Sequence, residues 1–174
     1  MQATSLNSSE QSKQYLSFML CTETYAVDIL LVKEILEFGT LTRVPMMPDF
    51  LRGVINLRGA VVPVIDLSAR FQLGRSDIGR KTCIVIVETF NGEENQDLGI
   101  VVDAVNEVLD IHNKQLEPAP NFGTRIRTDF IEQMVKTDTG FLIILDINNT
   151  LSLGEMSALA SIANPPEPAL ALSA

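Results

Sequence analysis

The sequence predicts a mainly β protein made of two small barrels of about five strands each, joined by short helices and followed by a C-terminal helix. Short runs rich in apolar and β-branched residues recur along the chain, and Gly, Pro, Asn and Asp separate them. These runs do not alternate with long amphipathic segments, which disfavours a layered α/β fold. The strands fall into two sets of about five, and each set is enough for one small barrel.

Composition narrows the possible functions. The 174 residues are 46% hydrophobic and 20% charged, as in an ordinary folded domain. The net charge of −9 disfavours nucleic acid or an anionic membrane as the main partner, because both bind clustered Lys and Arg. No apolar run reaches the roughly 18 residues of a transmembrane helix, and the N-terminus lacks signal-peptide features. We therefore expect a cytosolic protein that does not insert into a membrane.

The two ends of the chain differ from the rest in composition. The first residues are polar and rich in Ser and Gln, and the last are rich in Pro and Ala. We expect both to be flexible tails. The expected organisation is a tail at 1–13, a folded region at 14–163 and a second tail at 164–174, the folded region consisting of a first barrel at about 14–80, a second at about 81–147 and a helix at about 152–162.

The first barrel is expected to begin with two strands, at 15–20 and 25–28. The next segment carries apolar residues at Leu31, Ile35 and Phe38, the spacing of one helix face. We expect a short amphipathic helix over 29–38, which Asp28 can cap and Gly39 can end. The further elements expected in this set are a strand at 41–44, one helical turn at 49–52, the two strands of a hairpin and a short helix at 68–73.

The hairpin at 53–67 is the most informative segment of the chain. Its first strand alternates apolar and polar side chains, which assigns Val54, Asn56 and Arg58 to one face and Ile55 and Leu57 to the other. Gly59 can take the positive φ of a tight turn. The run 60–65 then reads as a returning, largely buried strand.

Arg58 and Pro63 are unusual inside an apolar hairpin. An arginine in this setting needs a partner for its charge, and a proline gives no backbone donor, so Pro63 is expected at a sheet edge or bulge. We assign Gly53, Gly59 and Pro63 to the turns that shape the hairpin. The hairpin is therefore predicted to be a core element with one face or edge open to another molecule.

The second set of elements follows residue 80. Ser152, with Glu155 three positions later, fits a capping box at the start of the C-terminal helix. The expected strands of this set are 82–90, 98–103, 105–111, 130–136 and 141–147, with a turn at 137–140 between the last two.

Chemical motifs for catalysis are weak in this sequence. The only histidine, His112, and the two cysteines, Cys21 and Cys83, form no metal-ligand cluster in sequence, and no nucleophile motif or phosphate-binding loop is present. Aspartates follow apolar strand ends at four positions, where we expect them to cap a turn or a helix, namely Asp66, Asp103, Asp110 and Asp146. The alternative is an enzyme that uses Asp66 or Asp103 between the barrels. We predict no catalytic residue, no metal and no cofactor.

Val32, Glu34 and Arg58 remain as candidates for binding. Val32 and Glu34 lie outside the apolar stripe of the helix expected at 29–38, so we expect them near the surface. One interpretation is a set of ordinary solvated residues. The other is an interaction patch, in which an exposed valine lies beside fixed charges.

Five segments of the chain together carry a family pattern. They are GVINLRGAVVPVIDLSARF at 53–71, YAVDILLVKEIL at 25–36, RVPMMPDF at 43–50, LGIVVDAV at 98–105 and LEPAP at 116–120. These segments resemble the CheW family, the coupling proteins of bacterial chemotaxis. The resemblance spans about residues 14–162, and a chance match over five segments is improbable.

The resemblance implies two five-stranded SH3-like barrels packed across a shared apolar core, and it implies no catalysis. The companion kinase carries the same domain, but no phosphotransfer, ATP-binding or receiver region flanks it here, so the stand-alone adaptor is the better match. The implied partners are the cytoplasmic tip of a chemoreceptor and the regulatory domain of the CheA histidine kinase, at the inner face of the membrane. A CheW-like adaptor of another receptor–kinase pathway, such as twitching motility, is the alternative.

The resemblance also implies where the receptor binds. Val32, Glu34 and Arg58 match family positions at the receptor-facing groove, and Asn56 and Cys83 fall beside them. The family often has an aliphatic residue where Cys83 stands. Kinase contacts carry no sharp motif in the family, so no residue is assigned to them.

Overall fold

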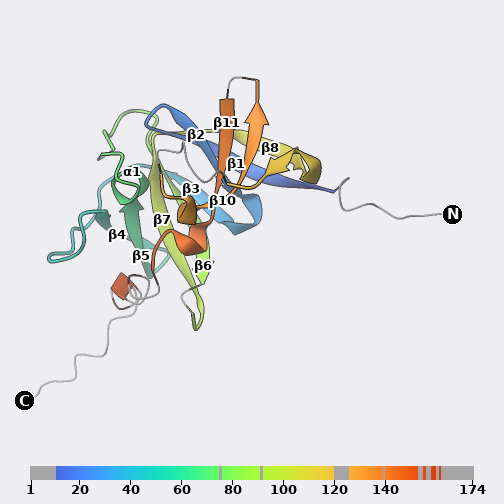
Figure 1. The fold of residues 1–174 in the computed structure, drawn as a ribbon. Coiled ribbons are helices and arrows are strands. Elements are labelled where there is room, and N and C mark those ends of the chain that lie inside the picture. The colour runs from blue at the N-terminus through green and yellow to red at the C-terminus, as the bar shows by residue number, and fades with distance from the viewer. Residues whose placement is uncertain are drawn as a thin grey trace, which may run out of the picture.

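The computed structural model of the chain describes residues 11–74, 76–90, 92–119, 126–138, 140–152, 155, 158–159 and 161. Two β-sheets dominate it, with a few short helices at the strand ends, so the predicted mainly β class is confirmed (Figure 1). No helix among these residues is long and apolar enough to cross a membrane. The tail segments 1–10 and 164–174 lie outside the described residues.

One sheet has six strands in the order β8-β1-β2-β11-β10-β9. All neighbours are antiparallel except β2 and β11, which run parallel. Figure 1 shows blue β1 and β2 beside orange β10 and β11, so strands from early and late in the sequence lie side by side in this sheet. The strands are β1 (Ser12–Leu20), β2 (Glu23–Asp28), β8 (Ala104–His112), β9 (Leu116–Glu117), β10 (Ile131–Thr137) and β11 (Gly140–Leu145).

The other sheet has five strands in the order β3-β6-β7-β5-β4. Here β5 and β7 run parallel and the other pairs are antiparallel. Neither sheet order closes on itself, so each sheet is a curled, open relative of a barrel. The strands are β3 (Val32–Glu37), β4 (Leu51–Leu57), β5 (Ala60–Asp66), β6 (Cys83–Phe90) and β7 (Asn95–Val102).

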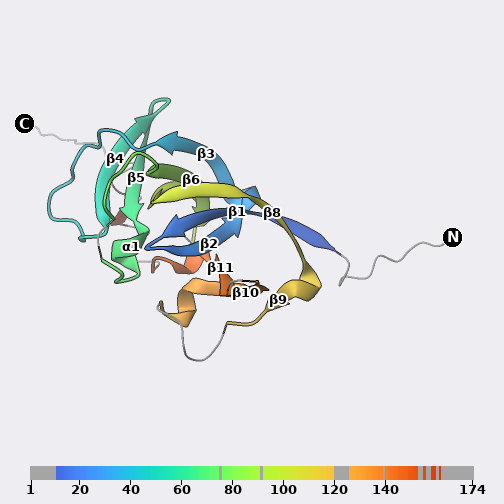
Figure 2. The same ribbon diagram turned by 90° about the horizontal axis from the view of Figure 1, so that it is seen from above.

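The sequence predicts one barrel at 14–80 and a second at 81–147, but the two sheets do not divide at residue 80. Strands β1 and β2 join the sheet that holds β8 to β11, whereas β3 to β5 join β6 and β7. The chain leaves one sheet after β2 and returns to it at β8, which continues almost directly from β7 (Figure 2). The first strand also begins at Ser12, inside the segment expected to be a flexible tail.

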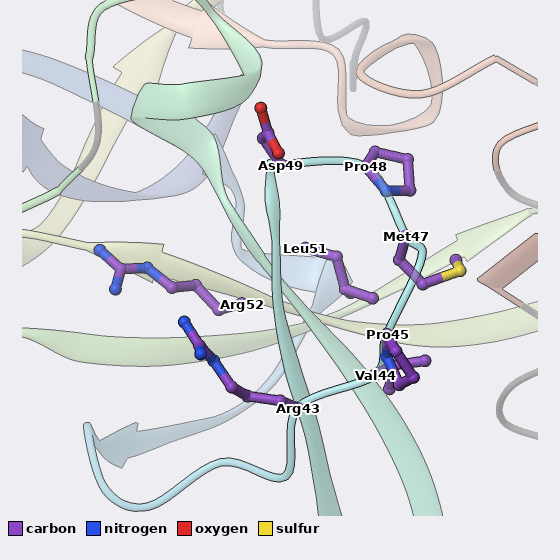
Figure 3. A pocket seen from close by; sticks show the side chains of 8 residues that line it. All are labelled: Arg43, Val44, Pro45, Met47, Pro48, Asp49, Leu51 and Arg52. Atoms are coloured by element: carbon purple, nitrogen blue, oxygen red, sulfur yellow. The ribbon is translucent and has the colours of Figure 1, made fainter.

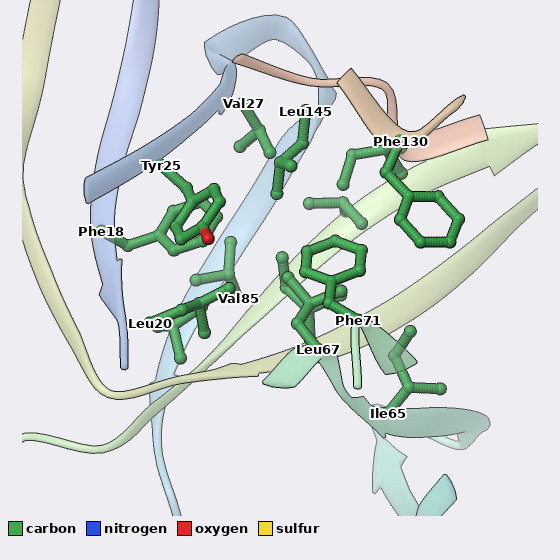
Figure 4. Close-up of a cluster of buried hydrophobic side chains, with 14 of the residues drawn as sticks. Phe18, Leu20, Tyr25, Val27, Ile65, Leu67, Phe71, Val85, Phe130 and Leu145 are labelled. Atoms are coloured by element: carbon green, nitrogen blue, oxygen red, sulfur yellow. The ribbon is translucent and has the colours of Figure 1, made fainter. Parts of the chain in front are cut away.

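Three apolar clusters fill the space within and between the sheets. Side chains from the two faces of one strand belong to different clusters. In β1, Phe18 packs between the two sheets, whereas Tyr15 packs on the opposite face of the six-stranded sheet. In the five-stranded sheet, Val85 packs between the sheets and Ile84 on the other face. Strands buried on both faces explain the nearly continuous apolar runs of the sequence. Figure 4 shows the shared cluster, which draws on both sheets.

The prediction of a helix at 29–38 is wrong. The chain forms a single 3-10 turn, η2 (Ile29–Leu31), and then strand β3. Asp28 does cap this turn, since its carboxylate accepts the Leu30 N–H at 2.9 Å. The side chains of β3 alternate between half-buried and exposed, a period of two that the chance spacing of Leu31, Ile35 and Phe38 concealed.

Two further expectations about short elements fail. The helical turn at 49–52 is absent, because residues 51 and 52 already belong to β4, and the strand at 41–44 is reduced to one bridge between Thr42 and Val54. The helix at 68–73 is shorter, α1 (Leu67–Arg70), and three 3-10 turns complete the described elements: η3 (Asn113–Gln115), η4 (Thr128–Phe130) and η5 (Ile147–Asn149).

The aspartates at strand ends mostly act as expected. Asp66 accepts the Ala69 N–H and caps α1, and Asp146 accepts the Asn149 N–H and caps η5. Asp103 accepts the N–H of Cys21 at 2.9 Å and so holds the β1–β2 turn. Asp110 is the exception, because it lies within β8 and caps nothing.

The C-terminal helix is described in part. Glu155, Ala158, Leu159 and Ser161 are helical, whereas the other residues of 153–162 lie outside the described residues. The capping box is confirmed: Glu155 accepts the Ser152 N–H at 2.7 Å, and Ser152 accepts the Glu155 N–H at 3.1 Å. Buried Leu159 joins the shared core.

Candidate functional site

The β4–β5 hairpin ends in a tight turn at Arg58 and Gly59. Both residues have positive φ, 52° and 88°, the pattern of a type I′ turn that matches the twist of the strands. The Asn56 side chain accepts the Gly59 N–H at 2.9 Å and so holds the turn from within. The turn therefore projects Arg58 into solvent, with 72% of its side chain exposed.

Arg58 is paired with Glu34, as the need for a partner charge suggested. The Arg58 Nη2 donates to Glu34 Oε1 at 2.6 Å, and this hydrogen bond raises the pKa of the guanidinium. Glu34 lies on β3, at one edge of the five-stranded sheet, and Arg58 lies at the hairpin of the opposite edge strand. The ion pair thus joins the two edges across the open side of the curled sheet, at the surface of the molecule.

Val32 does not lie with Glu34. A register shift in the β3–β6 pairing separates the two residues. It leaves Val32 against the core between the sheets, while Leu36, two residues after Glu34, packs on the opposite face. The five predicted receptor-binding residues therefore divide into two groups, with Glu34, Asn56 and Arg58 at the hairpin tip and Val32 and Cys83 at the junction of the sheets.

Cys83 begins β6 and is half-buried against the shared core. Burial raises the pKa of its thiol, so at neutral pH the residue acts as a small apolar side chain and not as a nucleophile. The Cys83 thiol donates to the Lys81 carbonyl oxygen at 3.3 Å, and the Val105 backbone is near enough to lower the thiol pKa, which places Cys83 beside β8 of the other sheet.

Two exposed apolar residues at this junction were not predicted from the sequence. Ile35 is 43% exposed on β3, and Val108 is 47% exposed on β8; both strands lie at sheet edges. Ile35 pairs with Val85 and Val108 with Leu16, so each shares the face of its strand that meets the shared core. We call the set Val32, Ile35, Cys83, Val105 and Val108 the junction strip. The exposure of Ile35 was missed because the sequence pattern placed it on the apolar face of the helix expected at 29–38. The exposure of Val108 was missed because the polar residues around it in sequence give no sign of an apolar surface.

Gly53 and Pro63 are inside strands and not in turns, which corrects their assignment. Gly53 has φ of 151°, and a Cβ there would meet the Thr42 carbonyl oxygen at 2.5 Å, so the glycine permits a close approach of two strands. Pro63 lies in an interior strand opposite Val54. Because Val54 exchanges both backbone hydrogen bonds with Thr42, Pro63 lies at a non-hydrogen-bonded position of the β4–β5 pair.

Of the two strand-end aspartates considered for catalysis, Asp66 and Asp103, the first is held entirely by structural hydrogen bonds. Asp66 is fully buried, and its oxygens accept hydrogen bonds from Arg52, Ser76 and the Ala69 N–H. No oxygen of this carboxylate is directed at solvent, so its geometry favours a structural role. Within the described ranges, no three His, Cys, Asp or Glu side chains gather in a way that could hold a metal ion.

Comparison with known proteins assigns the family. The model of the CheW-like domain matches residues 14–155. The chain belongs to the CheW-like domain family. The "Chemotaxis protein CheW" of Klebsiella aerogenes is 37% identical over 151 residues, which cover 87% of this chain and 89% of that protein. The protein of the same name from Bacillus subtilis is 38% identical and covers 77% of this chain and 83% of its own.

A solved structure of a CheW-like protein agrees with the fold. The crystal structure of "scaffolding protein TtCheW" from Thermoanaerobacter tengcongensis superposes with a TM-score of 0.73 at 38% identity. The match covers 80% of this chain and 88% of that one. The two open sheets described here are therefore the CheW-like arrangement.

Proposed function

We propose that this CheW-like protein is a non-catalytic adaptor, which couples transmembrane chemoreceptors to the CheA histidine kinase in chemotaxis arrays at the inner face of the membrane. The observation that carries this proposal is the match to proteins named for chemotaxis over nearly their whole length. These names favour chemotaxis over twitching motility as the pathway.

The receptor is proposed to bind across the hairpin tip and the junction strip. Arg58 is exposed and aligned by Glu34, and only one of its guanidinium nitrogens is engaged, so several N–H donors remain for a polar partner. The junction strip offers exposed apolar surface at Ile35 and Val108. A charged anchor beside an apolar strip suits the helical tip of a receptor, which presents both kinds of side chain.

The kinase is proposed to bind a separate surface of the same molecule. An adaptor that holds receptor and kinase at once raises the local concentration of each for the other, so no covalent change in the adaptor is needed. The signal then depends on the geometry in which the two partners are held.

The experiment that tests the receptor site is the substitution Arg58→Glu. We expect the fold to persist, because the side chain is solvent-exposed, and binding to a receptor cytoplasmic fragment to fall at least about tenfold, since a charge-assisted contact is lost and repulsion from Glu34 is added. Calorimetric titration measures the affinity, and kinase autophosphorylation measures coupling. Lys136→Glu, which reverses an exposed charge on β10 of the other sheet, is the matched control.

Exchanging the two charges distinguishes loss of the receptor contact from damage to the fold. The double variant Glu34→Arg with Arg58→Glu can restore the ion pair between the sheet edges but presents the opposite charge at the tip. We expect it to keep the fold, as the single variant does, and not to regain receptor binding. If Arg58→Glu binds and couples as well as the parent, the receptor site is not at this hairpin.

A further inference from the structure

A pocket of about 350 Å³ lies on the five-stranded sheet, outside the hairpin tip and the junction strip. Two arginines contribute to it, Arg43 from the segment before β4 and Arg52 from β4 itself. Figure 3 shows both side chains extending the same way from the backbone. The described residues that line it are Arg43, Val44, Pro45, Met47, Pro48, Asp49, Leu51 and Arg52.

The backbone brings the two arginines together. Thr42 and Val54 exchange two hydrogen bonds, at 3.0 and 2.8 Å, so the residues that follow Thr42 run alongside the start of β4. Gly53 permits this approach, because any larger residue would meet the Thr42 carbonyl oxygen. The bridge therefore brings the backbone of Arg43 next to the β4 backbone around Gly53, one residue from Arg52, and both arginines line the same pocket.

The two arginines differ in their counter-ions, since a carboxylate neutralises Arg52 but not Arg43. Arg52 is fixed by the buried Asp66 carboxylate and the Ser76 carbonyl through Nε and Nη2, which leaves its Nη1 without a partner among the described residues. Arg43 is exposed and, over the same residues, has no ion-pair partner. The pocket's own carboxylate, Asp49, lies at the far end of the pocket in Figure 3.

We propose that this pocket binds a carboxylate side chain of a partner protein segment in which acidic and apolar residues are neighbours. The carboxylate bridges Arg43 and the free Nη1 of Arg52, which gives the exposed Arg43 guanidinium a counter-ion. The apolar side chains of the segment pack on Val44, Met47 and Leu51. The complementarity is local, since the chain as a whole carries a net charge of −9.

The lip of the pocket favours a macromolecular segment over a small free anion. Met46 is fully exposed and has a positive φ of 62°, between Pro45 and Pro48. A large, fully exposed apolar side chain offers contact area that a small anion cannot use. A peptide chain that crosses the pocket covers Met46 and places one acidic side chain between the arginines.

The test uses two capped peptides with the full-length protein. One contains two glutamates between leucines, and the other contains glutamines at the same places. Amide and arginine Nε–H signals are followed by NMR during titration at low salt. We expect the glutamate peptide to shift the signals of Arg43 and Arg52, to bind at least about tenfold more tightly than the glutamine peptide, and to weaken as salt is added.

Variants decide whether the pocket is responsible. Arg43→Gln removes the exposed cation and is expected to abolish the preference for the glutamate peptide. Arg80→Gln removes an exposed cation outside the pocket and is expected to leave the preference intact. The proposal is overturned if both peptides bind alike, if neither binds, or if the two variants have equal effects. Receptor binding is not part of this measurement, so its outcome is independent of the proposed receptor site.

Discussion

At the scale of single residues, the exposed ion pair of Arg58 and Glu34 combines two roles. It joins opposite edges of the five-stranded sheet, and it presents a guanidinium with unused donors to solvent. Pairs this exposed contribute little to stability, because water and salt screen them. Its main effect is therefore to fix the direction of Arg58, which suits a residue that contacts another protein.

Gly53 gives a sharp prediction at the same scale. Gly53→Ala places a Cβ 2.5 Å from the Thr42 carbonyl oxygen at a φ of 151°, so we expect the free energy of unfolding to fall by at least about 2 kcal/mol. Gly39→Ala is the matched control, because nothing lies within 4 Å of its Cβ. Urea unfolding measures both variants. Equal stability of the two variants would contradict this account of the close approach.

Glu132 gives a prediction about pH. Partial desolvation raises the pKa of its carboxyl group, although the residue as a whole is exposed, and the charge of Asp146 raises this pKa further. The folded protein therefore holds this proton more tightly than the unfolded chain does, so the group stabilises the fold at low pH and loses that effect as the pH rises through its raised pKa. Glu132→Gln is expected to be slightly more stable than the parent at pH 7, by up to about 0.5 kcal/mol.

Comparing Glu132→Gln with the parent protein at low pH tests this explanation. At about pH 3 the glutamate is protonated in both states, so thermal unfolding of the variant and the parent should coincide. A variant that is less stable than the parent at pH 7 would show that the carboxylate is favourably placed.

At the scale of elements, the ends of the strands are fixed by capping carboxylates. Asp66 ends β5 and caps α1, and Asp146 follows β11 and caps η5. The two differ in burial and in partners, because only Asp66 is fully buried and bound to an arginine. Asp66 therefore connects β4, β5, α1 and the loop that carries Ser76.

This contrast predicts unequal effects for the same substitution. Asp66→Ala leaves Arg52 without its buried counter-ion and is expected to cost about 3–5 kcal/mol. Asp146→Ala removes only a cap and is expected to cost about 1 kcal/mol. Denaturant unfolding of the two variants provides the measurement. If the two losses are alike, the buried network does not stabilise the fold in the way its contacts indicate.

At the scale of the whole molecule, the two sheets are interleaved along the chain. The six-stranded sheet needs β1 and β2 from the beginning of the chain and β8 to β11 from its second half. The core between the sheets takes side chains from both halves as well, for example Phe18 and Phe130 (Figure 4). Neither sheet can therefore be completed by a continuous half of the sequence.

A fragment tests this statement. The segment 11–80 keeps the β1–β2 pair but lacks β8, β11 and β6, which pair with β1, β2 and β3 in the full chain. It is expected to remain unfolded, with narrow amide dispersion in an NMR spectrum, while the full chain shows wide dispersion. Mixing it with the segment 81–161 is expected to restore part of the dispersion. A fragment 11–80 that folds alone would show that the first half is an independent domain.

The sequence by itself determined those features that depend on residues close together in the chain. The alternation at 53–57, the turn at Arg58 and Gly59, the capping box at Ser152 and the class of fold all follow from backbone preferences and side-chain periodicity. The tertiary structure alone decided the rest. Residues 32–37 form strand β3 because β6 pairs with them, and Ile35 and Val108 are surface residues because their strands lie at sheet edges. Arg43 and Arg52 line one pocket, where Thr42 pairs with Val54. Such contacts join positions far apart in the chain, and no local pattern of residues encodes them.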